Sequence, residues 1–109
     1  MHVVQIDCSA IRDRESFHDV FARELGFPEF YGRNMDAWID CMGDIGSDGG
    51  MTRLHAQSTD KVVLYLSGFQ SLKERCPSLW VDLLECVAFV NWQAMEAGQE
   101  PMLLLATES

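Results

Sequence analysis

Three short runs of β-branched and aliphatic residues predict β-strands. They are HVVQI (2–6), KVVLYLS (61–67) and PMLLLAT (101–107), and the proline of the third run suits the start of a strand. Continuous apolar runs of this length are typical of strands that are buried on both faces. The pattern therefore favours a parallel sheet with helices packed against it.

Between the first two runs, the hydrophobic positions change to a helical period. Asp13 can cap a helix that stops at Gly26. The apolar stripe of this helix consists of Phe17, Val20, Phe21 and Leu25. Asn34 can cap a shorter helix that ends at Gly43. Its core-facing residues are Met35, Trp38 and Met42.

The later part of the chain predicts a loop and two more helices. Residues 43–60 are dense in Gly, Ser and Asp, which is typical of a surface loop. After the second strand, FQSLKERC (69–76) predicts a short helix, and Pro77 begins a long one that reaches Gly98. The expected core stripe of the long helix is Trp80, Leu83, Leu84, Val87, Val90 and Ala94, widened by Phe89 and Trp92. Core packing is the expectation for Trp92.

The predicted order of elements is β-α-α-β-α-α-β. Parallel strands need crossovers long enough to hold a helix, and each interval between these strands is that long. We therefore predict a single domain over residues 1–109, of the α/β class, with a three-stranded parallel sheet covered by about four helices.

Charge narrows the choice of partners. The chain has 17 acidic and 8 basic residues, a net charge of −9, and no Lys or Arg after Arg75. Such a surface repels nucleic acid and anionic membranes and attracts basic proteins. The first residues lack a signal-peptide pattern and no apolar run is long enough to span a membrane, so we expect a cytoplasmic protein. The four cysteines lack CxxC spacing, so we expect free, largely buried thiols and neither a metal nor a cofactor.

Two aspartates in the short second helix raise a specific question. Asp36 lies in the first turn, where the helix dipole favours a negative charge. Asp40 lies one turn later on the same side, where the dipole no longer helps and like charges repel. The core-facing residues turn both carboxylates outward, with Ile39 at the edge of the exposed side and Phe30 and Tyr31 just before the helix. These features favour a docking face for a cationic partner.

The segment LGFPEFYGRNMDAWIDC (25–41) resembles the signature of the barstar-like family, intracellular inhibitors of barnase-type ribonucleases. The similarity runs without gaps over residues 6–41 and continues more loosely through VVLYLSGF and EAGQEPMLLL. The resemblance implies that Asp36 and Asp40 stand where the family's two key helix carboxylates face basic residues of the nuclease and occupy the place of RNA phosphate. It also implies contacts from Phe30, Tyr31 and Asn34.

The sequence departs from the family pattern at three positions. Ile39 replaces a prominent exposed Trp, Ile45 stands at the next interface aromatic before an insertion, and Gln93 stands at an acidic position of the last helix. Asp44 prolongs the acidic field past the second helix. We therefore expect a one-to-one complex with a basic, secreted-type microbial ribonuclease or nuclease toxin other than barnase, and no binding of nucleic acid or membranes.

Three other interpretations remain open. An enzyme could use the aspartate pair, or His18 and His55, but His18 is expected at a surface or edge and no HExxH or GxSxG motif occurs. A metal site formed by Asp36, Asp40, Asp44 and Asp48 would not have EF-hand spacing. A non-inhibitory interaction module, or an immunity protein to another nuclease toxin, could share the fold and use Phe89 and Trp92.

Overall fold

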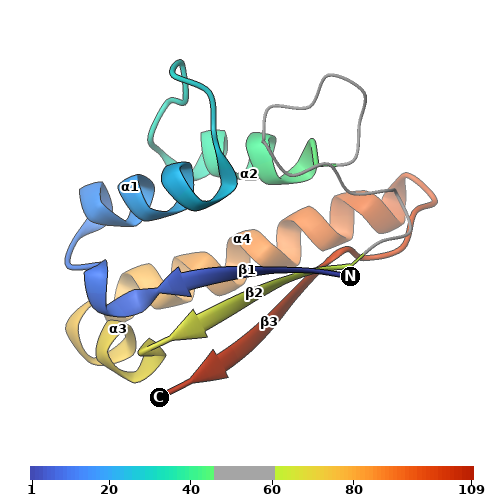
Figure 1. Cartoon of the computed structure of the whole chain (residues 1–109). Helices are drawn as coiled ribbons and strands as arrows, with labels where there is room; N and C mark the ends of the chain where they lie inside the picture. Colours follow the sequence, from blue (N-terminus) through green and yellow to red (C-terminus); the bar gives the residue numbers. More distant parts are fainter. Residues whose placement is uncertain (46–60) are drawn as a thin grey trace.

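One parallel sheet organises the fold (Figure 1). The computed structural model describes residues 1–45 and 61–109. In it, β1 (His2–Asp7), β2 (Val62–Ser67) and β3 (Leu103–Glu108) lie in the order β1-β2-β3. The predicted α/β class is confirmed, because the described residues form three parallel strands with two α-helices in each interval between them, in the predicted order. Most of the predicted loop, with Asp48 and His55, lies outside the described residues.

Local sequence signals begin and end the first helix. After the short 3-10 turn η1 (Cys8–Ala10), α1 (Arg14–Leu25) starts at a capping box. There, Asp13 Oδ1 accepts a hydrogen bond from the Ser16 amide at 2.8 Å, and Ser16 Oγ accepts one from the Asp13 amide at 3.0 Å. Gly26 ends the helix with a φ of 66°, a left-handed conformation that glycine adopts without strain.

The other helices also match the predicted segments. They are α2 (Met35–Gly43), α3 (Phe69–Arg75) and α4 (Pro77–Glu96). Pro77, at the start of α4, has no amide hydrogen to donate. An amide in the first turn has no acceptor within its own helix, so the proline removes no hydrogen bond from α4. None of the helices in the described residues combines the length and hydrophobicity that a membrane span requires.

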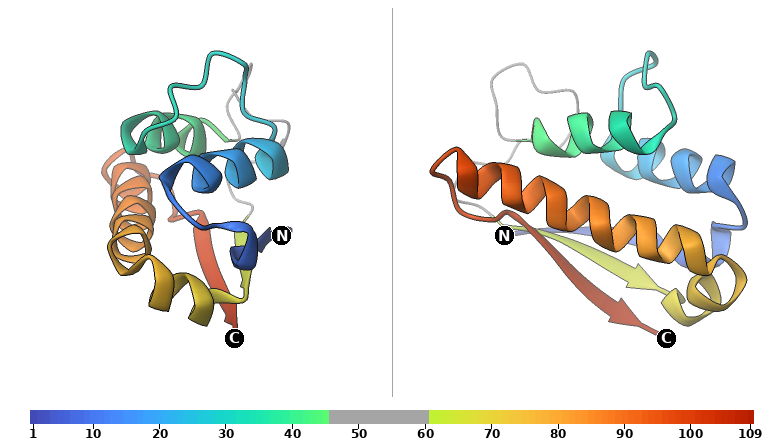
Figure 2. Two further views of the ribbon diagram at one scale, coloured as in Figure 1. Left: turned by 90° about the vertical axis from the view of Figure 1, so that its left-hand side faces the viewer. Right: turned by 180° about the vertical axis from the view of Figure 1, so that it is seen from behind.

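The helices lie on one face of the sheet, as the end-on view in Figure 2 shows. Right-handed crossovers between strands in consecutive order carry every helix to the same side. The β2 residues buried against the helices are Val62, Leu64 and Leu66. On the other face, Val63 is half-buried, and its register neighbours Val3 and Leu104 are 50% and 45% exposed. The prediction that the strands are buried on both faces is therefore wrong.

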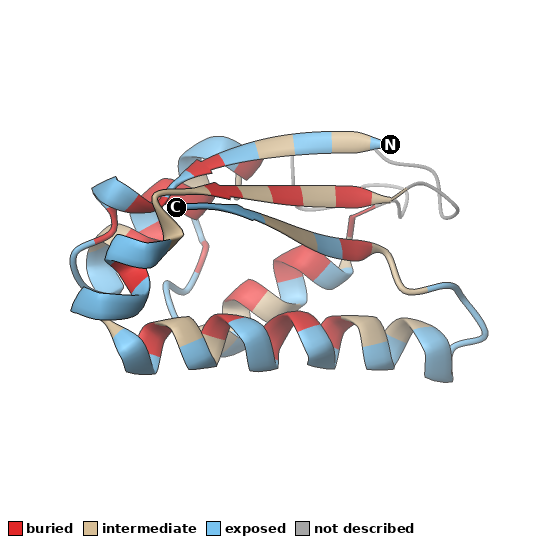
Figure 3. Ribbon diagram, turned by 90° about the horizontal axis from the view of Figure 1, so that it is seen from below, coloured by how far each residue is buried: buried red, intermediate tan, exposed pale blue. Residues whose placement is uncertain are grey.

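α4 buries a narrower stripe than predicted (Figure 3). The buried residues of α4 are Leu79, Leu83, Cys86, Val87 and Val90. Leu84, Phe89 and Trp92 are exposed, with Trp92 at 52%, so the prediction of core packing for Leu84 and Trp92 is wrong. A helix with apolar residues on most sides can be rotated in several ways, and its contacts with α2 and β3 select one of them.

His18 is buried, which corrects the expectation that it lies at a surface or edge. Its Nδ1 atom lies 2.5 Å from the hydroxyl of Tyr31, and its ring packs edge-on against Phe17. Burial lowers the pKa of His18, and the positive charges of Arg33 and Arg14 lower it further. The ring is therefore held neutral, so that Nδ1 can accept a hydrogen bond from the Tyr31 hydroxyl.

The four cysteines are free thiols. Cys8, Cys41 and Cys86 are buried and Cys76 is half-buried, in agreement with the expected burial. Burial, with a smaller contribution from the negative charge of Asp7, raises the pKa of Cys8 to about 11. This thiol is therefore protonated at neutral pH and is a weak nucleophile.

Candidate functional site

α2 presents a polar face because its other face is anchored in the core. Asn34 caps the helix by accepting a hydrogen bond from the Ala37 amide at 2.8 Å. Trp38 and Met42 are fully buried, and Trp38 packs edge-on against Phe21 with ring centroids 5.6 Å apart. These contacts fix the rotation of the helix, and the predicted exposure of Asp36 and Asp40 is confirmed.

Asp36 and Asp40 have no cationic partner among the described residues. The nearest arginine in the sequence, Arg33, points toward α1 instead. Its guanidinium donates hydrogen bonds to Asp19 Oδ1 at 2.8 Å and to the carbonyl of Glu15 at 3.0 Å. Arg33 also has a φ of 55°, which is uncommon for a residue with a side chain, so the ion pair and hydrogen bond help to hold a strained turn.

The residues around the two carboxylates divide into exposed and buried groups. Phe30 is 78% exposed, and Ile39 is half-buried beside the acidic face. Tyr31 and Ile45 are 8% and 6% exposed, which corrects the expectation that their side chains line a docking face. Tyr31 is drawn inward by its hydrogen bond to His18, and burial raises its pKa so that it keeps its proton. Ile45 packs into the core because it follows the buried end of α2.

Asn34 and Asp44 occupy the two ends of α2. Asn34 is exposed, but its side chain is engaged in the cap and also donates a hydrogen bond to the Gly32 carbonyl at 3.3 Å. Asp44 is half-buried at the C-terminal cap. Burial raises the pKa of Cys41, and the negative charges of Asp40 and Asp44 raise it further. The negative field of this face therefore reaches the core side of α2.

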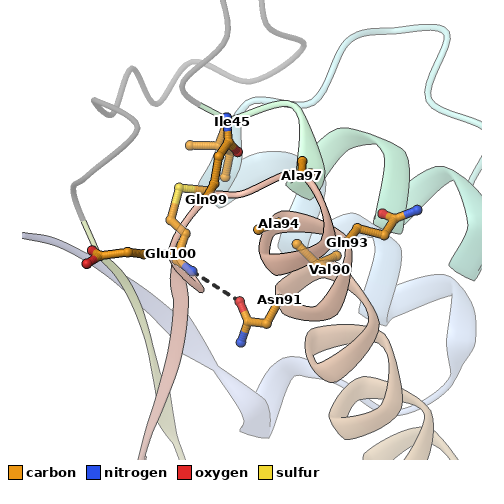
Figure 4. Close-up of a pocket in the computed structure, with 10 residues that line it drawn as sticks. Ile45, Val90, Asn91, Gln93, Ala94, Ala97, Gln99 and Glu100 are labelled. Carbon is orange, nitrogen blue, oxygen red and sulfur yellow. Dashed lines mark hydrogen bonds between the residues drawn. The ribbon is translucent and has the colours of Figure 1, made fainter.

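A cavity of about 280 Å³ lies between the end of α2 and the last turns of α4 (Figure 4). It is lined by Gly43, Ile45, Val90, Asn91, Gln93, Ala94, Ala97, Gln99, Glu100 and Met102. Among the described residues of this lining, Glu100 is the one that is ionisable, and its carboxylate lies 3.6 Å from Lys61 Nζ. The residues of the lining that the structure describes offer neither a nucleophile nor a pair of titratable groups for acid–base chemistry. No group of three His, Cys, Asp or Glu side chains in the described ranges is placed to hold a metal ion.

The family model described as Barstar (barnase inhibitor) matches residues 1–106. The chain belongs to the barstar family. A search of curated proteins finds no match. Members of the barstar family are inhibitors that bind barnase-like ribonucleases, so the family points to a ribonuclease inhibitor or a related protein on the same fold.

A second group of residues, on α4, lies beside α2 and was not predicted from the sequence. A groove separates these residues from α2. Its lining on α4 consists of Asp82, Glu85, Cys86 and Phe89, and its lining on α2 consists of Met35, Asp36 and Ile39. Burial raises the pKa of Cys86, and the nearby charges of Asp82, Glu85 and Asp36 raise it further. The available signal was the absence of Lys and Arg after Arg75, combined with acidic residues three positions apart in α4. This signal did not indicate which side of α4 faces α2.

Proposed function

We propose that the protein inhibits a microbial ribonuclease by covering its active site with the exposed face of α2. Asp36 and Asp40 would occupy the positions of substrate phosphates in a one-to-one complex formed in the cytoplasm. The observation that carries this proposal is the pair of exposed carboxylates, one helical turn apart, whose neighbouring Arg33 is engaged with Asp19. The expected partner is a basic ribonuclease or nuclease toxin.

The energetics of this face favour a cationic partner. In the free protein the two carboxylates remain hydrated, since no cation among the described residues pairs with them. Burying them in an interface is costly unless each receives charge-assisted hydrogen bonds. The Arg, Lys and His residues of a ribonuclease active site supply such bonds, whereas a neutral or acidic surface does not. The charge pattern therefore selects the partner by its chemistry.

The proposed contact residues are Asp36, Asp40, Asn34, Ile39, Phe30 and Asp44. Tyr31 and Ile45 support this face from beneath, because their side chains are buried. Ile39 offers less contact area than the tryptophan that the family pattern carries at this position, and aromatic residues contribute disproportionately to interface energies. We therefore propose a related ribonuclease, and not barnase itself, as the natural target.

Inhibition assays test the proposal directly. The purified chain is titrated against a panel of purified guanyl-preferring microbial ribonucleases, and the remaining activity on RNA is measured at several salt concentrations. We expect stoichiometric inhibition of at least one enzyme, weaker at high salt. Asp40→Ala should lose most of the inhibition. Glu74→Ala, which removes an exposed carboxylate from α3, is the matched control and should inhibit like the wild type. Equal inhibition by Asp40→Ala and the wild type contradicts the mechanism.

A further inference from the structure

A groove of about 410 Å³ separates α2 from α4 on the side that carries Asp36. We call it the α2–α4 groove. Its lining consists of Met35, Asp36, Ile39, Asp82, Glu85, Cys86 and Phe89. The groove is open to solvent and begins at the proposed docking face, since Asp36 and Ile39 belong to both.

The groove combines an apolar lining with negative charge. Met35, Ile39 and Cys86 supply apolar surface between the two helices. Asp36 and Glu85 are exposed beside it and have no ion pair among the described residues. Asp82 accepts a hydrogen bond from Arg14 at 2.6 Å, so its charge is largely compensated. Neither α2 nor α4 contains a Lys or Arg, and the groove therefore attracts a cation.

Exposed aromatic rings continue the groove along α4. Phe89 is 43% exposed and Trp92 is 52% exposed, and their ring centroids lie 5.8 Å apart. Trp92 follows Phe89 by three residues, so the two side chains share one side of the helix. A guanidinium group can stack on an aromatic face while it forms paired hydrogen bonds with a carboxylate. Lysine is less suited to stack on a ring and pair with a carboxylate at the same time, because its ammonium group is compact and strongly hydrated.

We propose that the α2–α4 groove receives an arginine-bearing segment of the same nuclease, so that the interface extends from Asp40 to Phe89 and Trp92. This inference rests on the proposed inhibitory function and adds a second contact region to it. The guanidinium would pair with Glu85 and Asp36, and its aliphatic stem would cover Ile39 and Cys86. Phe89 and Trp92 would supply aromatic contact area that Ile39 does not provide.

A second copy of this chain does not suit the groove. The chain carries a net charge of −9, and pairing two such faces would bring the carboxylates of Asp36 and Glu85 together without a cation from either helix. Like charges that face one another across an interface are destabilising. The charge pattern therefore favours a basic partner over self-association.

Binding measurements on groove variants test this extension. Glu85→Gln, Phe89→Ala and Trp92→Ala are compared with the wild type by calorimetry against whichever ribonuclease of the panel binds the wild type. The controls are Val81→Ala and Glu96→Gln, which change exposed residues of α4 outside the groove lining. We expect each groove variant to weaken binding by about tenfold or more, and each control to stay within about twofold. All five changes are at exposed positions, and circular dichroism checks that each variant is folded.

Two further measurements identify the contact. Trp38 is fully buried and Trp80 is half-buried, whereas Trp92 is 52% exposed, so the part of the acrylamide quenching that is lost in Trp92→Phe reports on Trp92. Binding of the ribonuclease should protect Trp92 from quenching. A double-mutant cycle that pairs Glu85→Gln with alanine substitution of each surface arginine of the ribonuclease should find one arginine whose effect depends on Glu85.

The outcomes separate the two proposals. If Asp40→Ala abolishes binding while the groove variants bind like the wild type and Trp92 stays quenchable, the groove contact is wrong and the inhibitory function stands. If the groove variants bind weakly but no arginine couples to Glu85, the arginine assignment is overturned. If no ribonuclease of the panel binds the wild type, the proposed function fails and the groove inference fails with it.

Discussion

Asp40 carries its charge at a position where the fold gains nothing from it. The helix dipole stabilises a carboxylate at Asp36, in the first turn of α2, but not one turn later at Asp40. Like charges four residues apart in a helix also repel by a few tenths of a kcal/mol, about 0.2–0.5. A residue that is mildly unfavourable in the free protein and exposed to solvent is well suited to a role in binding.

Asp40→Asn tests this separation of stability from binding. We expect the free energy of unfolding in urea to stay the same or rise by a few tenths of a kcal/mol, because the repulsion from Asp36 is relieved. Binding should weaken by about 2 kcal/mol or more, following a generalisation drawn in part from the barnase–barstar pair itself. Asp19→Asn is a useful comparison, since it removes the carboxylate that holds Arg33 and should lower stability. A clear loss of stability in Asp40→Asn would show that the fold needs this charge.

His18 makes the stability depend on pH. Its pKa is lowered in the folded chain, chiefly by burial and then by Arg33 and Arg14, from an ordinary value of 6.5. His18 therefore binds a proton more readily in the unfolded chain than in the folded chain. The stabilisation is fully present above the unfolded value and is lost as the pH falls below it toward the lower folded pKa.

The expected result is a fall in the free energy of unfolding, measured by urea denaturation, as the pH is lowered from neutral through 6.5 and below. His18→Gln should flatten this slope, because glutamine does not titrate. Tyr31→Phe should keep most of it, because the imidazole remains buried. Equal slopes for the wild type and His18→Gln would mean that other groups cause the pH dependence.

At the scale of elements, the turn before α2 sets the position of the acidic face. Asn34 caps the helix, the preceding residue Arg33 pairs with Asp19 of α1, and Tyr31 contacts His18 of α1 through a hydrogen bond. These three interactions fix the start of α2, and Trp38 and Met42 fix its rotation. The exposed carboxylates are held in place by contacts in which they take no part.

Asn34→Ala should lower the free energy of unfolding by about 1 kcal/mol, within a usual range of 0.5–2, because the Ala37 amide loses its side-chain acceptor. Asn34→Asp is the matched control and should restore most of the loss, since aspartate is an equally good cap. Urea denaturation of the three proteins measures the effect. If Asn34→Ala is as stable as the wild type, the cap does not contribute as the geometry indicates.

At the scale of the whole molecule, the charge is unevenly distributed. The chain has a net charge of −9, and α2 and α4 lack basic residues. Among the ion pairs of the described residues, Arg14–Asp82 is the one that involves a carboxylate of α4, and the others, such as Arg33–Asp19, involve no carboxylate of α2 or α4. The carboxylates of α2 and α4 together therefore give one side of the molecule a negative electrostatic potential. This potential extends farther from the surface than that of any single residue and acts on approaching partners.

This field should accelerate association with a basic ribonuclease. We expect the association rate constant from stopped-flow fluorescence to fall steeply with ionic strength, since the screening length shrinks from about 30 Å at 0.01 M salt to about 10 Å at 0.1 M. The dissociation rate constant should change much less. Glu85→Gln and Asp36→Asn should each lower the low-salt association rate, whereas Val81→Ala should not. An association rate that does not depend on salt would contradict steering.

Much of this molecule follows from local sequence signals. Asp13, Asn34 and Gly26 mark helix ends through hydrogen bonds with residues a few positions away, and Pro77 marks one through its own backbone geometry, so the sequence alone predicts these ends. The exposure of Asp36 and Asp40 also follows, because Trp38 and Met42 occupy the opposite side of a short helix and leave one possible rotation.

Only the tertiary structure decided the features that depend on distant parts of the chain. Tyr31 is buried because His18, thirteen residues away in sequence, accepts its hydrogen bond. Trp92 is exposed because α4, apolar on most sides, is rotated by its contacts with α2 and β3. Val3 and Leu104 are exposed because the crossovers place the helices on one face of the sheet. The α2–α4 groove has the same origin: its two sides are far apart in the sequence, and packing alone brings Glu85 beside Asp36.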